Sequence, residues 1–260
     1  MYRKLRIVFI LLGFDPRRLL SSLLYSSRYV REFFLIRRTL LASGLSERSV
    51  VVSPRLSEYK SQSAKPTRHY FVQDNFVADL VAVKSPKSVL DIGSRTDGYV
   101  SQLRHITTVT VADIREPNYT LKNVTHVTCD ITDPESVADL FSRHDFALIT
   151  CLHTIEHIGL GRYGDQISIH GDETALKNIF LNMQDNSEFI LSVPYSNFPR
   201  IEFNAQRVYD LGWIKTVLPS EARLVHCWLF DDDDKMIPPN TDHEPVEFGF
   251  MILLLRKEVK

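Results

Sequence analysis

The fold is decided by residues 87–98, which read Lys-Ser-Val-Leu-Asp-Ile-Gly-Ser-Arg-Thr-Asp-Gly. The apolar run at 89–92 predicts a short buried strand that ends at Gly93, and a helix is expected to open at Tyr99. In a doubly wound sheet, the loop after the first strand holds a nucleotide-like ligand. Arg95 stands where a dinucleotide fingerprint needs its middle glycine, and Tyr99 stands where a P-loop needs lysine. A pyrophosphate site is therefore disfavoured and a P-loop is excluded.

Two acidic residues at the ends of neighbouring predicted strands narrow the class of ligand. Asp91 directly precedes the first glycine of the loop, and Asp113 closes the next predicted strand at 108–113. An acid at the end of the second strand accepts both hydroxyls of a ribose, whereas an acidic loop repels a phosphate. A phosphate-free nucleoside that carries an amine, a carboxylate and a sulfonium meets both conditions, which indicates S-adenosylmethionine.

At these residues the chain resembles the class I S-adenosylmethionine-dependent methyltransferases. Predicted strands alternate with predicted helices, so we expect an α/β fold: a Rossmann-like, mostly parallel sheet whose last strand is antiparallel, with an N-terminal helical arm. Further strands are expected at 124–129, 146–150, 189–193, 224–230 and 246–255, and helices from 133, at 172–183 and at 208–218. The resemblance implies a cofactor site made of Asp91, Gly93, Ser94, Asp113, Ile114, Asp130, Ile131 and Leu152.

A second motif follows the predicted central strand, at residues 152–165: Leu-His-Thr-Ile-Glu-His-Ile-Gly-Leu-Gly-Arg-Tyr-Gly-Asp. On a helix, His153, Glu156 and His157 share one face, and His-x-x-Glu-His also matches the inverted zincin motif. That motif belongs on a long helix, so a metal-dependent hydrolase ranks behind a methyltransferase. Some small-RNA and quinone-precursor methyltransferases bind a divalent metal through Glu-x-x-Glu-His at this place. Because His153 replaces their first Glu, both a metal site at these three residues and metal-free packing stay open.

The two stretches together resemble an uncharacterised methyltransferase-like family whose bacterial members often accompany cell-surface polysaccharide genes. Ser-Val-Pro at 192–194 and Phe-Asn-Ala-Gln-Arg-Val-Tyr at 203–209 extend the resemblance over about residues 66–256. It implies O-methylation of a sugar or of a lipid-linked glycan intermediate. A non-catalytic S-adenosylmethionine-binding partner of a glycan enzyme is the rival interpretation.

Removal of a hydroxyl proton needs a base, and an imidazole titrates near neutrality. His157 and His153 are the candidate bases, and Asp165 is expected to orient a histidine or take the proton itself. Arg162, Tyr163 and Arg207 are the candidate substrate contacts. Each of these three residues also has a structural interpretation: Arg162 as a partner of Asp165, Tyr163 as a side chain packed under the loop, and Arg207 as a surface ion pair.

Charge is distributed unevenly along the 260 residues. Residues 1–45 carry nine basic and two acidic side chains, a net charge of +7, so the remainder carries −8 of the overall −1. The acidic remainder argues against a core that binds nucleic acid. We expect a basic amphipathic arm at 1–45, a linker at 46–66 and a methyltransferase-like domain at 67–260. The arm's expected partner is an anionic membrane surface, or else the core or a second copy of the chain.

The three cysteines, Cys129, Cys151 and Cys227, lie in apolar surroundings at no metal-binding spacing. They indicate buried free thiols in a reducing compartment rather than a disulfide framework. We therefore expect a cytoplasmic protein, in peripheral contact with the inner membrane face if the arm binds lipid.

Overall fold

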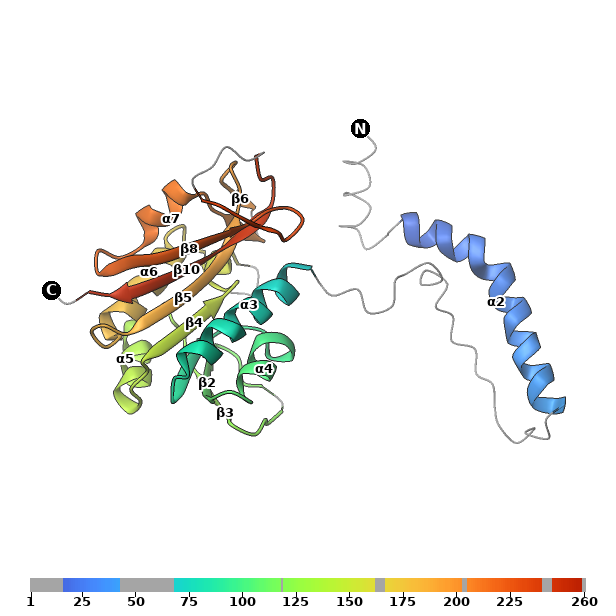
Figure 1. Cartoon of the computed structure of the whole chain (residues 1–260), viewed down its shortest axis with the longest axis horizontal. Coiled ribbons are helices and arrows are strands. Elements are labelled where there is room, and N and C mark those ends of the chain that lie inside the picture. Colours follow the sequence, from blue (N-terminus) through green and yellow to red (C-terminus); the bar gives the residue numbers. More distant parts are fainter. Residues whose placement is uncertain are drawn as a thin grey trace. The chain divides into compact units, whose positions relative to one another are not determined.

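The computed structural model describes residues 16–42, 68–117, 119–161, 167–202, 205–239 and 245–258. The chain divides into two compact units, residues 1–65 and 66–260. In the first unit the described element is the helix α2, Pro16–Ala42, drawn in blue in Figure 1. The linker predicted at 46–66 lies outside the described residues. No helix in the described part of the chain is both long and apolar enough to cross a bilayer.

The second unit is built on a mixed sheet, which in the described residues has eight strands in the order β3-β2-β1-β4-β5-β10-β8-β9 (Figure 1). Strands β1 to β5 are parallel, β10 runs antiparallel between β5 and β8, and β9 pairs antiparallel with β8. This arrangement confirms the predicted fold class. The strands are β1 (Ser88–Ile92), β2 (Thr108–Asp113), β3 (Val124–Thr128), β4 (Leu148–Leu152), β5 (Glu188–Tyr195), β8 (Ala222–Phe230), β9 (Met236–Ile237) and β10 (Gly249–Lys257).

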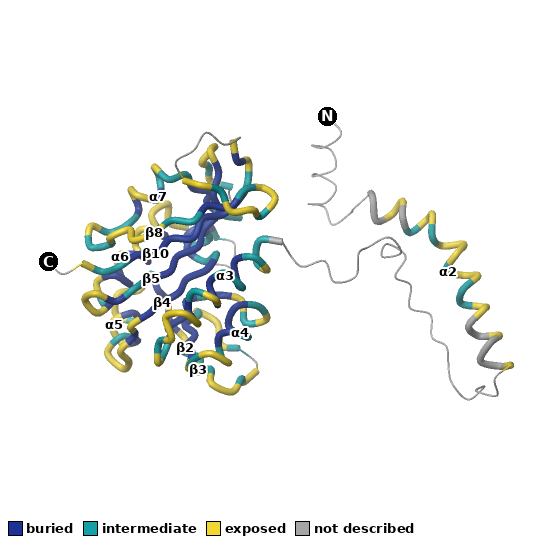
Figure 2. Tube along the Cα trace, viewed as in Figure 1, coloured by how far each residue is buried: buried dark blue, intermediate teal, exposed yellow. Residues whose placement is uncertain are grey.

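Helices cover both faces of this sheet. One core cluster joins the sheet to α3 (Arg68–Lys84) and to the turns η2 (Thr96–Val100) and α4 (Ser101–Leu103). The other joins it to α5 (Pro134–Arg143), α6 (Gly171–Asn182) and α7 (Leu211–Val217). Every residue of β4 is buried, as expected for a central parallel strand with both faces covered. Figure 2 shows these central strands in dark blue. Burial of each large apolar side chain contributes about 1.5–3 kcal/mol.

Several boundaries differ from the sequence prediction in the carboxyl half of the chain; the strand expected at 246–255, for example, is β10 at 249–257. The expected helix at 208–218 begins only at Leu211, because residues 206–208 form β7 (Gln206–Val208), which pairs with β6 (Arg200–Glu202). Asp210 caps the helix by accepting a hydrogen bond from the Trp213 amide at 2.6 Å. The strand predicted at 146–150 lies two residues later, at 148–152.

Candidate functional site

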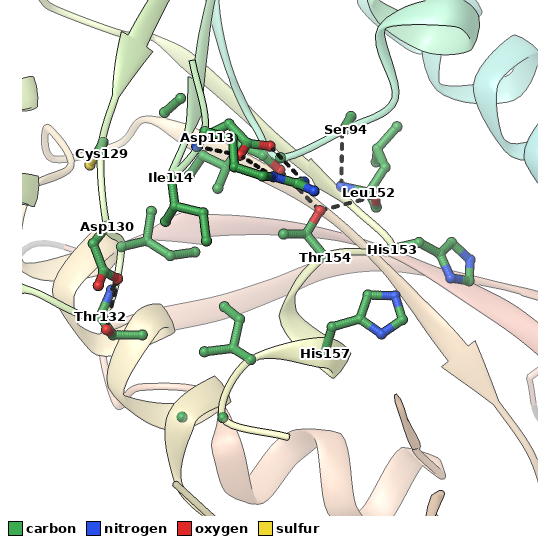
Figure 3. Close-up of a pocket in the computed structure, with 18 of the residues that line it drawn as sticks. Ser94, Asp113, Ile114, Cys129, Asp130, Thr132, Leu152, His153, Thr154 and His157 are labelled. Carbon is green, nitrogen blue, oxygen red and sulfur yellow. Dashed lines mark hydrogen bonds and ion pairs between the residues drawn. The ribbon is translucent and has the colours of Figure 1, made fainter. Parts of the chain in front are cut away.

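A cavity of about 1040 Å³ opens at the carboxyl ends of β1, β2, β3 and β4, where ligands bind in parallel α/β sheets. Seven of the eight predicted cofactor residues line it: Gly93, Ser94, Asp113, Ile114, Asp130, Ile131 and Leu152. In Figure 3, Asp130 and Thr132 lie toward one end of the view, and His153 and His157 lie toward the other. The cavity therefore joins the predicted nucleoside residues to the two imidazoles.

The loop after β1 is held against the end of β4. Gly93 has a φ of +67°, and a Cβ at this position would lie 2.6 Å from Cγ2 of Thr154, so both conformation and space require glycine. The hydroxyl of Ser94 accepts a hydrogen bond from the Leu152 amide at 3.3 Å. These contacts keep the loop backbone at the wall of the cavity.

Asp91 shapes this loop from inside the sheet. Its carboxylate is fully buried and accepts hydrogen bonds from the Ser94 amide at 3.2 Å and from the Thr150 hydroxyl at 2.8 Å. Burial raises the pKa of Asp91 to about 7, although the hydrogen bonds from Ser94 and Thr150 act to lower it. Asp91 is not part of the cavity lining. The predicted direct contact between Asp91 and the cofactor is therefore not supported by this placement.

The nucleoside end of the cavity has two carboxylates in defined positions. Oδ1 of Asp113 accepts hydrogen bonds from the backbone amide of Arg115 at 2.9 Å and from its Nε at 3.2 Å. Oδ1 of Asp130 accepts from the amide and the hydroxyl of Thr132, at 2.8 and 2.7 Å. Both carboxylates line the cavity, and the side chain of Asp113 is 25% exposed. An acceptor for ribose hydroxyls is thus available, and Arg115 steadies its orientation.

His153 is held in an unusual backbone conformation at the end of β4. Its φ is +50°, in the left-handed region that costs energy for a residue with a side chain. Its amide donates to the Ser192 carbonyl at 2.9 Å, and its ring packs edge-on against Tyr70 and Phe250. Nδ1 of His153 lies 2.9 Å from Oε1 of Glu156, which is fully buried. The motif forms the short 3-10 turn η3 (Ile155–His157) rather than a helix over all five residues.

His157 is oriented by a different partner. Its Nδ1 lies 2.6 Å from the Ala205 carbonyl oxygen, which only accepts, so Nδ1 carries the proton and Nε2 of the neutral ring does not. Nε2 lies 3.7 Å from Oε1 of Glu156. Within the described residues no group of three or more His, Cys, Asp or Glu side chains is arranged to hold a metal ion. The divalent metal predicted at His153, Glu156 and His157 is therefore not supported.

Of the remaining predicted residues, Asp165, Arg162 and Tyr163 lie outside the described residues. Arg207 is described, is fully buried and is not part of the cavity lining. Its Nη1 donates to the Ile158 carbonyl at 2.7 Å, and its Nη2 donates to the Ile169 carbonyl at 2.9 Å. Arg207 thus ties together both sides of the segment that follows η3, and neither a substrate contact nor a surface ion pair fits this placement.

Sequence reasoning missed a wall of the cavity that comes from α3. Tyr70, Gln73 and Asp74, all on α3, line it. Gln73 and Asp74 are buried, and Gln73 accepts a hydrogen bond from the Ser192 hydroxyl at 2.7 Å. The sequence could have shown this wall through Gln73 and Asp74, two polar residues among the apolar residues of α3, because buried polar groups need a partner or a function.

Comparisons with known proteins agree with this architecture. Residues 100–218 match a family model described as "Caenorhabditis protein of unknown function, DUF268". A search of curated proteins returned no match. The chain is similar in structure to the 1,6-didemethyltoxoflavin-N1-methyltransferase of Burkholderia thailandensis, solved with 1,6-didemethyltoxoflavin and S-adenosylhomocysteine, with a TM-score of 0.53 and 14% identity over 82% of this chain and 93% of that chain.

A second similar structure is a SAM-dependent methyltransferase from Anabaena variabilis, with a TM-score of 0.50 and 12% identity over 72% of this chain and 86% of that chain. At such identities the likeness concerns the fold. The sheet order with its antiparallel β10, the cavity at the strand ends and these two structures agree. The chain has the Rossmann-like fold of the class I methyltransferases.

Proposed function

We propose that this protein is an S-adenosylmethionine-dependent methyltransferase that methylates an oxygen of a sugar or of a lipid-linked glycan intermediate. The observation that carries the proposal is the cavity at the strand ends, which brings seven predicted cofactor residues together with two imidazoles. The structural likeness to a methyltransferase solved with S-adenosylhomocysteine supports it. The glycan part rests on the resemblance of the two sequence motifs to a family found with polysaccharide genes.

Each part of the cofactor has a matching partner in the cavity. Asp113 would accept the ribose hydroxyls, and the apolar side chains of Ile114 and Ile131 would flank the adenine. The loop at Gly93 and Ser94 would hold the methionine end, because its backbone is kept at the cavity wall. With these roles, the methyl-bearing end of the cofactor would face the carboxyl end of β4, next to His153.

The reaction is an in-line displacement at the methyl carbon. The acceptor oxygen would form a bond to carbon while the carbon–sulfur bond breaks, and sulfur would keep the electron pair to give neutral S-adenosylhomocysteine. The hydroxyl proton must pass to a base, and alignment of oxygen, carbon and sulfur supplies much of the rate. Because the leaving group is neutral, no residue has to stabilise a negative charge on sulfur. The residues of this chain mainly position the reactants and accept one proton.

His153 is the better oriented of the two candidate bases. When Nδ1–H donates a hydrogen bond to Glu156, the lone pair of the neutral ring is on Nε2, a buried atom that has no hydrogen-bond partner in the described structure. The strained backbone of His153 is consistent with a functional position, because such strain concentrates at active sites. In this proposal Glu156 positions the ring, and His157 flanks the acceptor.

Calorimetry tests cofactor binding, and transfer of labelled methyl groups from S-adenosylmethionine to a panel of nucleotide sugars and lipid-linked sugars tests turnover. We expect S-adenosylhomocysteine to bind, and Asp113→Asn to weaken that binding roughly 10- to 100-fold, as loss of a charged hydrogen-bond acceptor does. Glu116→Gln, an exposed acid three residues along, is the control. Absence of binding would refute the proposal. Binding with no transfer to any sugar would favour the non-catalytic partner.

A further inference from the structure

Asp74 is a buried acid on the wall of the cavity. It lies on α3, one turn after Tyr70, and both side chains line the cavity together with Ser94 and Arg95 from the loop after β1. Only 6% of Asp74 is exposed. A carboxylate so placed loses most of its hydration, which costs free energy unless hydrogen bonds or an opposite charge replace it.

The protein supplies only part of that compensation. Oδ1 of Asp74 accepts a hydrogen bond from Gln73 at 3.1 Å, and the backbone amide of Tyr99 also donates to the carboxylate. Within the described residues no ion pair reaches Asp74, since Arg95 is bound to Asp97 through Nε at 3.0 Å and Nη2 at 2.7 Å. Burial raises the pKa of Asp74, although Gln73, Tyr99, Arg95 and His153 act in the opposite direction.

Gly98 provides the space that lets Asp74 approach the loop. A Cβ at Gly98 would collide with Oδ2 of Asp74. Gly98 is not among the residues with a positive φ, so its backbone conformation does not itself require glycine. Gly98, the last residue of the stretch 87–98, is therefore needed to make room for the Asp74 carboxylate rather than to form a tight turn.

We propose that Asp74 binds the α-ammonium group of the cofactor's methionine end. The assignment rests on the proposed function, because it presumes a ligand of the S-adenosylmethionine class. An ammonium carries a full charge and three donors, which matches a partly compensated carboxylate beside the loop of Gly93 and Ser94. It also supplies the acidic contact that Asp91, enclosed by Ser94 and Thr150, does not make.

Two ligands that differ at the amino-acid end test this role without an acceptor. S-Adenosylhomocysteine carries the ammonium, whereas methylthioadenosine has the same nucleoside and thioether without it. We expect Asp74→Asn to weaken S-adenosylhomocysteine binding roughly 10- to 100-fold in calorimetry, as loss of a hydrogen bond between charged groups does. Methylthioadenosine should bind the variant and the parent alike. Asp79→Asn removes an exposed acid from the same helix and should change neither affinity.

A second variant keeps the carboxylate of Asp74 and changes its position. Gly98→Ala should displace the Asp74 carboxylate, so it should show the same selective loss, with circular dichroism confirming that both variants are folded. Equal weakening of both ligands, or of neither, would overturn the role of Asp74 while leaving the proposed function standing. Failure of the parent protein to bind either ligand would overturn the proposed function and this inference together.

Discussion

Oε1 of the fully buried Glu156 lies 2.9 Å from Nδ1 of His153. The same oxygen lies 3.7 Å from Nε2 of His157, so one carboxylate stands between two imidazoles. The contact with His153 fixes which ring nitrogen carries the proton, and it does so in a cavity where a hydroxyl proton would have to be removed.

Loss of the His153 ring should abolish most turnover without affecting cofactor binding. We expect His153→Gln to lower the methyl-transfer rate by roughly 10²- to 10⁴-fold, the usual contribution of a general base, while S-adenosylhomocysteine affinity stays within about twofold of the parent, as expected for a residue that contacts the acceptor only. Single-turnover rates and calorimetry measure the two effects. Unchanged turnover would contradict the base role.

Glu156→Gln should alter the ring of His153 in the resting protein. An amide can either accept from Nδ1–H or donate to Nδ1, so we expect the imidazole to populate both tautomers. Nitrogen NMR of labelled histidine measures the tautomer and its pH titration directly. Glu173→Gln is the matched control, because Glu173 bonds Nδ1 of the exposed His170 at 3.0 Å with the same spacing. A His153 spectrum identical to that of the parent would refute the positioning role.

Asp91 should make stability depend on pH. Because its folded-state pKa is raised from 3.8 to about 7, the folded protein binds more protons than the unfolded chain between those values. The contribution of Asp91 to the unfolding free energy should therefore fall as pH rises from about 4 to about 7, by an amount on the order of a few kcal/mol, and then level off. Asp91→Asn should lack this part of the slope in urea unfolding, whereas Asp79→Asn should keep it. The same pH dependence of the unfolding free energy in Asp91→Asn and in Asp79→Asn would contradict the prediction.

Arg207 should contribute to stability through the segment after η3. Arg207→Met leaves the carbonyls of Ile158 and Ile169, and the buried Asp172, without their cationic partner. We expect a loss of about 3–5 kcal/mol in denaturant unfolding and faster hydrogen exchange at residues 167–169. Arg200→Met, which breaks the half-exposed pair with Glu202, should cost less than about 1 kcal/mol. Similar costs for the two variants would show that the buried contacts are not the stabilising ones.

We also propose that α2 binds an anionic membrane surface. It exposes Leu20, Leu23 and Leu24 together with Arg31 and Arg38, and such a helix combines apolar burial with attraction to acidic lipids. The full chain should float with vesicles that contain phosphatidylserine, less so at high salt and not with neutral vesicles. Leu20→Glu with Leu24→Glu should abolish flotation, whereas Ser22→Glu with Ser26→Glu is the matched control. No flotation, with dimers in sedimentation, would instead identify a second copy of the chain as the partner.

Part of the site follows directly from local sequence. The strand at 88–92 and the conformation of Gly93 follow from residues adjacent in the chain, and neighbouring parallel strands must end at one edge of the sheet. Asp113 is the last residue of β2, and Asp130 follows β3, so both acids are expected at the same cavity without any knowledge of side-chain packing. The same reasoning could not show that Asp91 faces Thr150, because the facing strand is far away in sequence.

The sequence by itself determined the alternation of strands and helices, the loop after β1 and the positions of Asp113, Asp130 and the two histidines at or just after strand ends, because these depend on periodicity and on adjacent residues. Only the tertiary structure decided that α3 brings Asp74 against Gly98, that Arg207 is buried beneath the segment it ties together, and that Glu156 orients His153 from a 3-10 turn. The first two depend on how residues far apart in the chain pack together. The third depends on His153, a residue in the left-handed region whose amide is held by the Ser192 carbonyl of β5.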